Sequence, residues 1–475
     1  MQYLGFEAYE KSINAIGSST IFMAKEGNEP VIIIALGDAA AQETLGFTGT
    51  KGEDGKIRVP LSHENAEALR KHFPFTAPVQ GLRKDRSFGV GDRLGIATPG
   101  HIKVFEQYDV FPIFAQQSIR ELNLTNRTYE NVLDAVSFAV FREGFKRGFG
   151  ADGDHLKTVK DVEYALSLGF SMITLDCSDH IKTGEQAAPV PKHFLDTYLN
   201  QDFAIGEGIT LSFTEEELKR DLAIYGEAIQ FAADMYTRFF KNGAYQGDFE
   251  ISIDETTAPT TPLQHFFVAR ELINAGVSFA TLAPRFCGEF QKGIDYRGDL
   301  AQFEQEIKVH AVIARHFGYK LSIHSGSDKL SVFPAIGRET RGVFHVKTAG
   351  TNWLEAMRVV ALVDPALYRE THQYALSVFE EATKYYHVTT DLARIPDVKT
   401  LKDQDLPRLF ENNDSRQLIH ITYGLILSKK NPDGSYTFKD RLYRLWQDHE
   451  ALYTEALVQH IGKHIDLLGV KKGTT

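Results

Sequence analysis

In the stretch DFEISIDET, residues 248–256, polar and apolar side chains alternate from Asp248 to Asp254. Side chains two residues apart in a strand point to the same face, so Glu250, Ser252 and Asp254 share one face. The apolar face of such a strand normally packs against helices, which leaves the polar face for the interior of a barrel. Buried polar side chains cost free energy unless they are hydrogen-bonded or hold a ligand. The stretch therefore predicts a barrel strand with a functional inner face.

Seven more stretches with strand character alternate with segments of helical period. They are RSFGVGD (86–92), VFPIFAQQ (110–117), RGFGADGD (147–154), SMITLDCSD (171–179), SFATLAPRF (278–286), KLSIHSGS (320–327) and VFHVKTAGT (343–351). Eight strands separated mostly by helices favour an α/β fold with a closed (β/α)8 barrel of the TIM type. An open doubly wound sheet explains this rhythm less well.

On this interpretation the chain has three parts. Residues 1–80 are a small N-terminal α/β extension, residues 81–355 the (β/α)8 catalytic barrel, and residues 356–475 a C-terminal helical cap. An insertion at about residues 180–245 separates the fourth strand from the fifth. It carries an amphipathic helix whose first turn Thr214 caps in a capping box.

The composition excludes several classes of partner. The formal net charge of −11, from 52 basic and 63 acidic residues, repels nucleic acid and anionic lipid. Two cysteines, Cys177 and Cys287, exclude a disulfide-rich scaffold and a multi-thiolate zinc site. The sequence has neither a secretory signal pattern nor an apolar run of the ~18 residues that span a bilayer. We expect a cytoplasmic protein that binds neither nucleic acid nor membranes. The sequence is compatible with a homo-oligomer and does not decide the oligomeric state.

In a (β/α)8 barrel the active site lies at the C-terminal ends of the strands. Three histidines, His155, His324 and His345, come from three separate strand ends. Imidazoles with carboxylates and without thiolates suit a divalent cation such as Zn, Mn, Fe, Co or Ni. The candidate carboxylates, as ligands or proton carriers, are Asp154, Asp176, Glu250 and Asp254. The alternative is that each histidine is simply hydrogen-bonded to a neighbouring loop.

The loop SGSDK, residues 325–329, follows His324 and offers anion-binding groups. It offers backbone N–H groups, the hydroxyls of Ser325 and Ser327, and the ammonium group of Lys329. Such a combination suits a carboxylate or a phosphate, although the same residues could simply begin a helix. The further candidate substrate-binding residues are Lys347, Arg285 and Asp176.

Four long phrases carry a resemblance to a known family. They are GFGADGDHLKT (148–158), the run from ISIDETTAP to FQKGIDY (251–296), LSIHSGSDKLSVFP (321–334) and FHVKTAGTNWLEAMRVVA (344–361). Together they resemble the tagaturonate epimerase family of bacterial uronate catabolism, from about residue 80 into the C-terminal cap. The resemblance implies a divalent-metal enzyme that interconverts D-tagaturonate and D-fructuronate.

The resemblance also implies roles for individual residues. Asp154 is the expected proton acceptor, and His155, His324 and His345 are the expected metal ligands. The second acid/base group falls on the pair Asp254 and Glu255, and Lys329 or another cation holds the substrate carboxylate.

The two sugar acids differ at a carbinol carbon β to the ketone, whose C–H bond the ketone does not acidify directly. Retro-aldol cleavage avoids this difficulty, because a base removes the hydroxyl proton and the metal stabilises the enediolate formed when the C–C bond breaks. The aldehyde fragment then rotates, and the bond re-forms on its other face. Two alternatives stay open: a metal-dependent sugar-acid aldolase or ketose isomerase on the same barrel, and a sugar-acid-binding or regulatory protein without catalysis.

Overall fold

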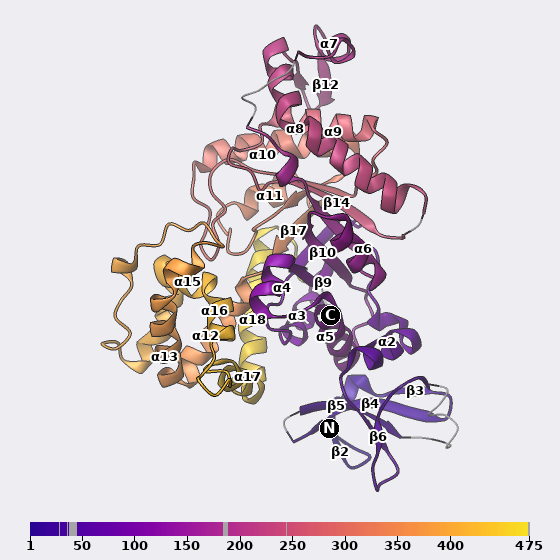
Figure 1. Ribbon diagram of the computed structural model, residues 1–475, viewed down its shortest axis with the longest axis vertical. Coiled ribbons are helices and arrows are strands. Elements are labelled where there is room, and N and C mark those ends of the chain that lie inside the picture. The colour runs from indigo at the N-terminus through magenta and orange to yellow at the C-terminus, as the bar shows by residue number, and fades with distance from the viewer. Residues whose placement is uncertain (28, 36, 38–44, 184–188, 244, 474–475) are drawn as a thin grey trace.

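The computed structural model describes residues 1–27, 29–35, 37, 45–183, 189–243 and 245–473 (Figure 1). Its centre is a closed barrel of parallel strands in the order β10-β11-β14-β15-β16-β17-β8-β9. The strands are β8 (Arg86–Val90), β9 (Phe111–Ser118), β10 (Gly150–Leu156), β11 (Met172–Asp176), β14 (Asp248–Ile253), β15 (Thr281–Pro284), β16 (Lys320–Ile323) and β17 (Phe344–Thr348). Each predicted barrel strand is present, and the predicted (β/α)8 fold is confirmed.

Helices cover the outside of the barrel. They are α3 (Thr98–Phe105), α4 (Ile119–Thr125), α5 (Tyr129–Glu143), α6 (Val159–Ser167), α8 (Glu215–Tyr236), α9 (Pro262–Asn274), α10 (Leu300–Phe317), α11 (Phe333–Glu339) and α12 (Thr351–Val363). The apolar residues of the strands, such as Ile251 and Ile253 of β14, are buried in one hydrophobic cluster with residues of these helices other than α12, which belongs to a second cluster. The apolar side chains of β14 therefore face the helices, as the alternation in the sequence predicted.

The inside of the barrel is polar. The buried residues that alternate with the apolar ones include Ser87, Asp152, Thr174, Glu250, Ser252, Ser322 and His345, each 0% exposed. TIM-type barrels are commonly filled by layers of branched apolar side chains. Since buried polar groups need partners, this interior requires a connected network of hydrogen bonds and ion pairs.

The N-terminal extension is a seven-stranded antiparallel sheet, with β3 pairing β4 beside the order β1-β2-β4-β5-β7-β6. Its strands are β1 (Gln2–Tyr3), β2 (Phe6–Ala8), β3 (Asn14–Ile16), β4 (Ser19–Glu26), β5 (Glu29–Ala35), β6 (Thr50–Lys51) and β7 (Ile57–Val59). Helix α2 (His63–His72) begins after Ser62, whose hydroxyl caps the Asn65 N–H at 3.4 Å. Figure 1 shows the sheet at the end of the molecule remote from α7 and β12.

The insertion between β11 and β14 forms a subdomain at the opposite end (Figure 1). It contains the 3-10 turn η3 (Ser178–His180), α7 (Lys192–Tyr198), the hairpin β12 (Phe203–Gly206) and β13 (Ile209–Leu211), and the long helix α8. The predicted capping box of α8 is present, because Thr214 and Glu217 each accept the other's backbone N–H. Residues 184–188 and 244 of the predicted insertion lie outside the described residues.

The C-terminal region is helical, as predicted. It comprises α13 (Pro365–Ser377), α14 (Phe379–Ala382), η5 (Leu392–Arg394), η6 (Asp403–Glu411), α15 (Asn413–Ile421), α16 (Tyr423–Ser428), α17 (Lys439–Asp448) and α18 (Glu450–Leu467). These helices share a second apolar cluster with α12, centred on Trp353 and Trp446. Among the described residues, we find no helix with the length and apolar character that crossing a lipid bilayer demands.

Replacing Thr214 with Ala should lower the free energy of unfolding by about 1 kcal/mol, because the first turn of α8 loses its side-chain cap. Urea titration measures this, and Thr214→Ser, which keeps the hydroxyl, should unfold like the wild type. Turnover should not change. An unchanged unfolding midpoint in Thr214→Ala would contradict the proposed contribution of the capping box.

Candidate active site

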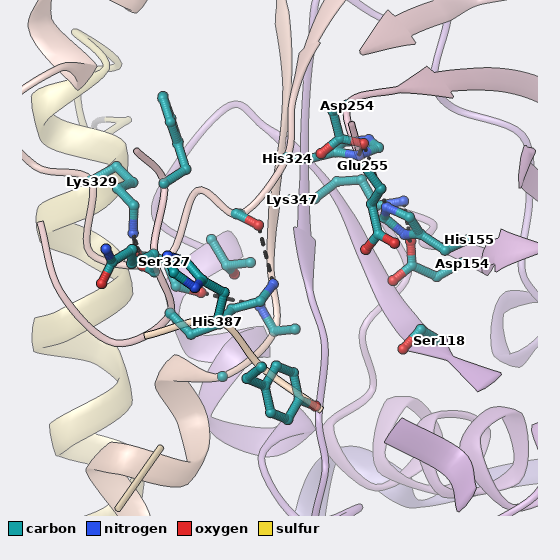
Figure 2. A pocket seen from close by; sticks show the side chains of 18 of the residues that line it. Ser118, Asp154, His155, Asp254, Glu255, His324, Ser327, Lys329, Lys347 and His387 are labelled. Carbon is teal, nitrogen blue, oxygen red and sulfur yellow. Dashed lines mark hydrogen bonds and ion pairs between the residues drawn. The ribbon is translucent and has the colours of Figure 1, made fainter. Parts of the chain in front are cut away.

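A cavity of about 420 Å³ lies at the C-terminal ends of the barrel strands. The loops after β9, β10, β14, β15, β16 and β17 form its walls, and Tyr385, Tyr386 and His387 of the C-terminal cap close one side. Figure 2 shows two groups of labelled side chains in this cavity. One group contains Asp154, His155, Asp254, Glu255, His324 and Lys347. Ser327 and Lys329 lie apart from it. The predicted location of the site at this end of the barrel agrees with the structure.

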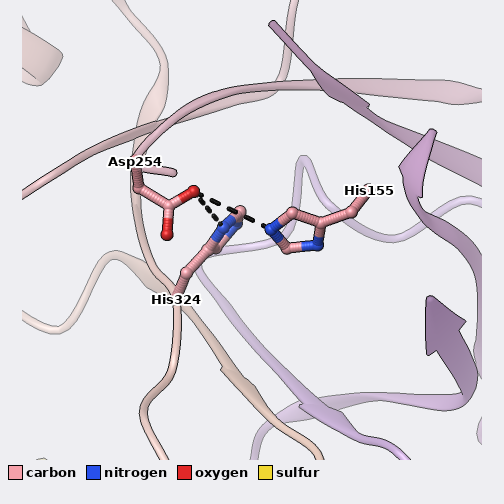
Figure 3. Close-up of side chains that lie close together, drawn as sticks. All are labelled: His155, Asp254 and His324. Carbon is pink, nitrogen blue, oxygen red and sulfur yellow. Dashed lines mark hydrogen bonds and ion pairs between the residues drawn. The ribbon is translucent and has the colours of Figure 1, made fainter. Parts of the chain in front are cut away.

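Two imidazoles and a carboxylate converge in that group (Figure 3). Asp254 Oδ1 lies 3.1 Å from His324 Nδ1 and 3.8 Å from His155 Nε2. The two rings have their centroids 4.9 Å apart. The other ring nitrogens are also engaged, His155 Nδ1 at 2.7 Å from Asp154 Oδ1 and His324 Nε2 at 2.8 Å from Glu250 Oε1.

The backbone that carries these rings is locally strained. His155 has φ 55° at an irregularity in the pairing of β10, and Ser325, directly after His324, has φ 51°. Residues other than glycine rarely adopt this left-handed conformation, which costs of order 1–3 kcal/mol unless the surroundings impose it. The fold therefore holds both histidine segments in conformations they would not adopt by themselves.

The loop after β16 is fixed from outside by the C-terminal cap. Asp328 Oδ1 lies 2.7 Å from His460 Nε2 of α18, and Asp328 Oδ2 lies 2.9 Å from an Arg416 nitrogen of α15. The backbone N–H of Asp328 donates to His464 Nε2 at 2.9 Å. Asp328, His460 and His464 have ligand atoms within 4.8 Å of one another, but in this structure their contacts brace the loop against the cap.

A single ammonium group binds the carboxylates at the base of the cavity. Lys347 Nζ lies 2.6 Å from Asp152 Oδ2 and 3.2 Å from Glu250 Oε1, contacts Asp154 Oδ1, and donates to Thr174 Oγ1 at 2.7 Å. Burial by itself lowers the pKa of Lys347, but the three carboxylates raise it above its usual value. Lys347 is therefore charged at neutral pH and serves as their shared counter-ion.

The pKa values of Asp152 and Asp154 shift in opposite directions, although both carboxylates contact Lys347. Burial raises the pKa of Asp152 to about 6 in spite of Lys347. Burial also acts to raise the pKa of Asp154, but Lys347 and His155 outweigh it and hold that pKa well below its usual range. Asp154 is therefore an ionised carboxylate at neutral pH, able to accept a hydrogen bond.

A divalent cation fits the group formed by His155, Asp254 and His324. Each offers a ligand atom, and these atoms all lie within 4.8 Å of one another. Burial acts to raise the pKa of Asp254, but the imidazoles of His324 and His155 hold it well below its usual range, so the carboxylate is ionised. Two imidazoles and one carboxylate are a common donor set for catalytic metals.

Comparisons with known proteins agree with this site and fold. The family model for UxaE, tagaturonate epimerase, matches residues 9–468. The tagaturonate/fructuronate epimerase of Thermotoga maritima is 45% identical over 479 residues, covering 98% of this chain and 97% of that protein. The native and glycerol-bound crystal structures of fructuronate-tagaturonate epimerase UxaE from Cohnella laeviribosi are 49% and 48% identical. Each has a TM-score of 0.94 and covers 98% of this chain and 97% of its own.

The chain belongs to the tagaturonate epimerase family. This membership confirms the resemblance seen in the sequence, and it makes the protein an isomerase of the epimerase class. The relatives extend over nearly the whole chain, so the N-terminal sheet and the helical cap are covered by the match together with the barrel.

The structure of this tagaturonate epimerase family member separates His345 from the other two predicted ligands. The His345 ring is fully buried inside the barrel, with Nδ1 3.0 Å from Ser87 Oγ. Its Nε2 has no hydrogen-bond partner among the described residues and lies 3.9 Å from Glu250 Oε2. Burial lowers the pKa of His345 to about 3, so the ring is neutral. In this structure Asp254, not His345, completes the group with His155 and His324.

Lys329, a predicted substrate-binding residue, lines the cavity, but its ammonium group is engaged by backbone carbonyls. Its ammonium group donates to the carbonyls of Gln291 and Ile294, both at 2.7 Å, and of Ser327 at 2.8 Å. These three bonds use its three donors. Lys329 therefore joins the loop after β15 to the loop after β16.

The other predicted residues divide into two groups. Ser325, Ser327, Arg285, Glu255 and Lys347 line the cavity. Asp176 does not reach it, because its Oδ1 accepts the Ser178 N–H at 2.9 Å at the start of η3. Glu255 lies at the rim and pairs with Arg120 at 3.4 Å.

Sequence reasoning missed Lys292, which lines the cavity from the loop between β15 and α10. No short motif marks it. A usable signal was the length of that loop, residues 285–299, because long loops without secondary structure in a compact domain are commonly functional.

Replacing Lys347 with Met should lower the free energy of unfolding by roughly 3–5 kcal/mol at pH 8, since it leaves buried carboxylates without a counter-ion. Without Lys347 the pKa values of Asp152, Asp154 and Glu250 in the folded state rise above their unfolded values, because the ammonium group no longer opposes the effect of burial. Protonation then favours the folded state, so the loss should shrink as pH falls from 8 to 5. Denaturant titrations at both pH values measure this, and a loss independent of pH would contradict the assigned charge network.

Proposed function

We propose that the protein interconverts D-tagaturonate and D-fructuronate with a divalent metal ion, by retro-aldol cleavage and aldol re-formation. The observation that carries this proposal is the full-length family match, joined to a cavity in which a potential metal-binding group adjoins an ionised carboxylate. A cytoplasmic location belongs to the same proposal, and the two free, buried cysteines are compatible with it.

The metal-binding residues in this proposal are His155, Asp254 and His324. A divalent cation held there would supply Lewis-acid stabilisation for the negative charge that develops on the ketone oxygen when the C–C bond breaks. Glu250 orients the His324 ring through the contact at Nε2, and Asp154 does the same for His155 at Nδ1. Such outer contacts fix the tautomer and direction of a ligand ring.

The proton carriers in this proposal are Asp154 and Glu255. Asp154 is ionised beside Lys347 and accepts the proton of the carbinol hydroxyl. Asp254 is less suited to proton transfer because it lies between two imidazoles. Glu255, which lines the cavity from the end of β14, therefore handles the hydroxyl proton when the carbinol carbon has the opposite configuration. The partly enclosed cavity holds the aldehyde fragment while it rotates.

Protein treated with EDTA should lose turnover of tagaturonate to fructuronate, followed by NMR, and regain it when one suitable divalent ion is restored. His155→Ala, His324→Ala and Asp254→Asn should each lower the bound metal measured by elemental analysis by at least roughly tenfold. His345→Ala should retain metal. Full metal content in His324→Ala, or loss confined to His345→Ala, would eliminate the proposed ligand group.

In deuterated water, the product should carry no deuterium at the inverted carbinol carbon, because retro-aldol chemistry breaks a C–C bond and leaves that C–H bond intact. Mass spectrometry and proton NMR of the product measure this. Deuterium at the inverted carbon would instead indicate direct deprotonation. Accumulation of two free three-carbon fragments would favour the alternative aldolase activity, and formation of an aldose would favour a ketose isomerase.

A further inference from the structure

A sugar acid brings a carboxylate that takes no part in the proposed bond cleavage, and a partly enclosed site must neutralise it. Most cations near the cavity are already committed. Lys347 pairs with three buried carboxylates, Lys329 donates to three carbonyls, and Arg120 pairs with Glu255. The charge that holds the substrate must therefore come from elsewhere in the wall.

Lys292 meets this requirement. Its side chain lines the cavity, and its ammonium nitrogen lies 3.1 Å from the hydroxyl oxygen of Ser325. No carboxylate of the described residues lies within ion-pair distance of it. Burial lowers the pKa of Lys292, and the guanidinium groups of Arg120 and Arg93 lower it further, against an opposing effect of Glu121. A bound anion would relieve this excess of positive charge.

The neighbouring backbone is arranged for the same kind of ligand. Ser325 belongs to the loop after β16, the seventh barrel strand, and Gly350 to the loop after β17, the eighth. TIM-type barrels frequently bind anionic groups between these two loops. Gly350 lines the cavity at the start of α12, where no side chain caps the helix. Uncapped N–H groups and the helix dipole favour negative charge there.

The start of α12 is closely packed on the side of Gly350 that faces His420. A Cβ atom at position 350 would collide with the ring of His420, which lies against the glycine. The glycine at this position therefore allows the His420 ring to pack against the start of α12.

We infer that Lys292, with the hydroxyl of Ser325 and the first turn of α12, binds the carboxylate of the sugar-acid substrate. This inference rests on the proposed function for the identity of the substrate, but the carboxylate site itself can be tested separately. Because Ser325 directly follows His324, the site fixes the acid end of the substrate beside the proposed metal-binding group. Lys292 is then the residue that selects a sugar acid over a neutral sugar.

The test compares Lys292→Met, Lys292→Arg and Arg285→Met with the wild type. Arg285→Met is included because Arg285 also lines the cavity without an ion pair among the described residues. The matched control is Lys182→Met, which removes an equal charge from an exposed pair with Glu227. Epimerisation kinetics are measured together with NMR titrations of two non-reacting probes, D-glycerate and its neutral counterpart glycerol.

Lys292→Met should raise KM for tagaturonate and weaken glycerate binding by roughly 10- to 100-fold, the usual effect of losing a hydrogen bond to a charged group. The value of kcat should change much less, since the carboxylate is bound equally before and during reaction. Glycerol binding and the Lys182→Met control should not change, and Lys292→Arg should restore most of the affinity.

Equal losses for glycerate and glycerol in Lys292→Met would overturn the inference, because they indicate general disruption of the cavity. A charge-selective loss in Arg285→Met alone would also overturn it and assign the carboxylate to Arg285. If the wild type binds glycerate through Lys292 but does not epimerise tagaturonate, the proposed function fails while the carboxylate site stands.

Discussion

The ammonium group of Lys347 is the interaction on which the rest of the site depends. It lies inside a barrel whose inner face is polar, where Asp152, Asp154 and Glu250 would otherwise repel one another in a medium of low dielectric constant. Burial raises the pKa of Asp152, and only Lys347 opposes that effect strongly. One cation on β17 thereby allows strands β10 and β14 to carry acidic residues into the centre of the molecule.

The charge network extends directly to the proposed metal-binding residues. Asp154 contacts both Lys347 and His155, and Glu250 contacts both Lys347 and His324. Each histidine is thus oriented by a carboxylate that Lys347 keeps ionised. The C-terminal cap acts on the same region from outside, because Asp328 in the loop after His324 is held by α15 and α18. The barrel interior and the cap therefore position the His324 segment together.

Much of the site was predictable because strand periodicity and barrel geometry are local or general rules. Alternation in β14 placed Glu250 and Asp254 on the inner face, and the rule of C-terminal strand ends brought His155 and His324 into one cavity. The backbone contacts of Lys329 and Asp176 were not predictable, because nothing in the sequence shows which backbone groups lie near their side chains in the fold. The sequence correctly predicted that the side chain of His345 points into the barrel. It did not show how deep the ring lies, because that depth depends on how neighbouring strands are staggered.

The sequence by itself determined the eight strands, the closed barrel and the family, because hydrophobic period and long shared phrases are properties of the chain. Only the tertiary structure decided which charges neutralise one another. Lys329 lies in the loop after β16, and its ammonium group donates to backbone carbonyls. Lys347 lies near the end of β17, and its ammonium group pairs with carboxylates instead. Lys292 is left to face the cavity. The physical reason is that pairing depends on distances between segments remote in the chain, which no local pattern specifies.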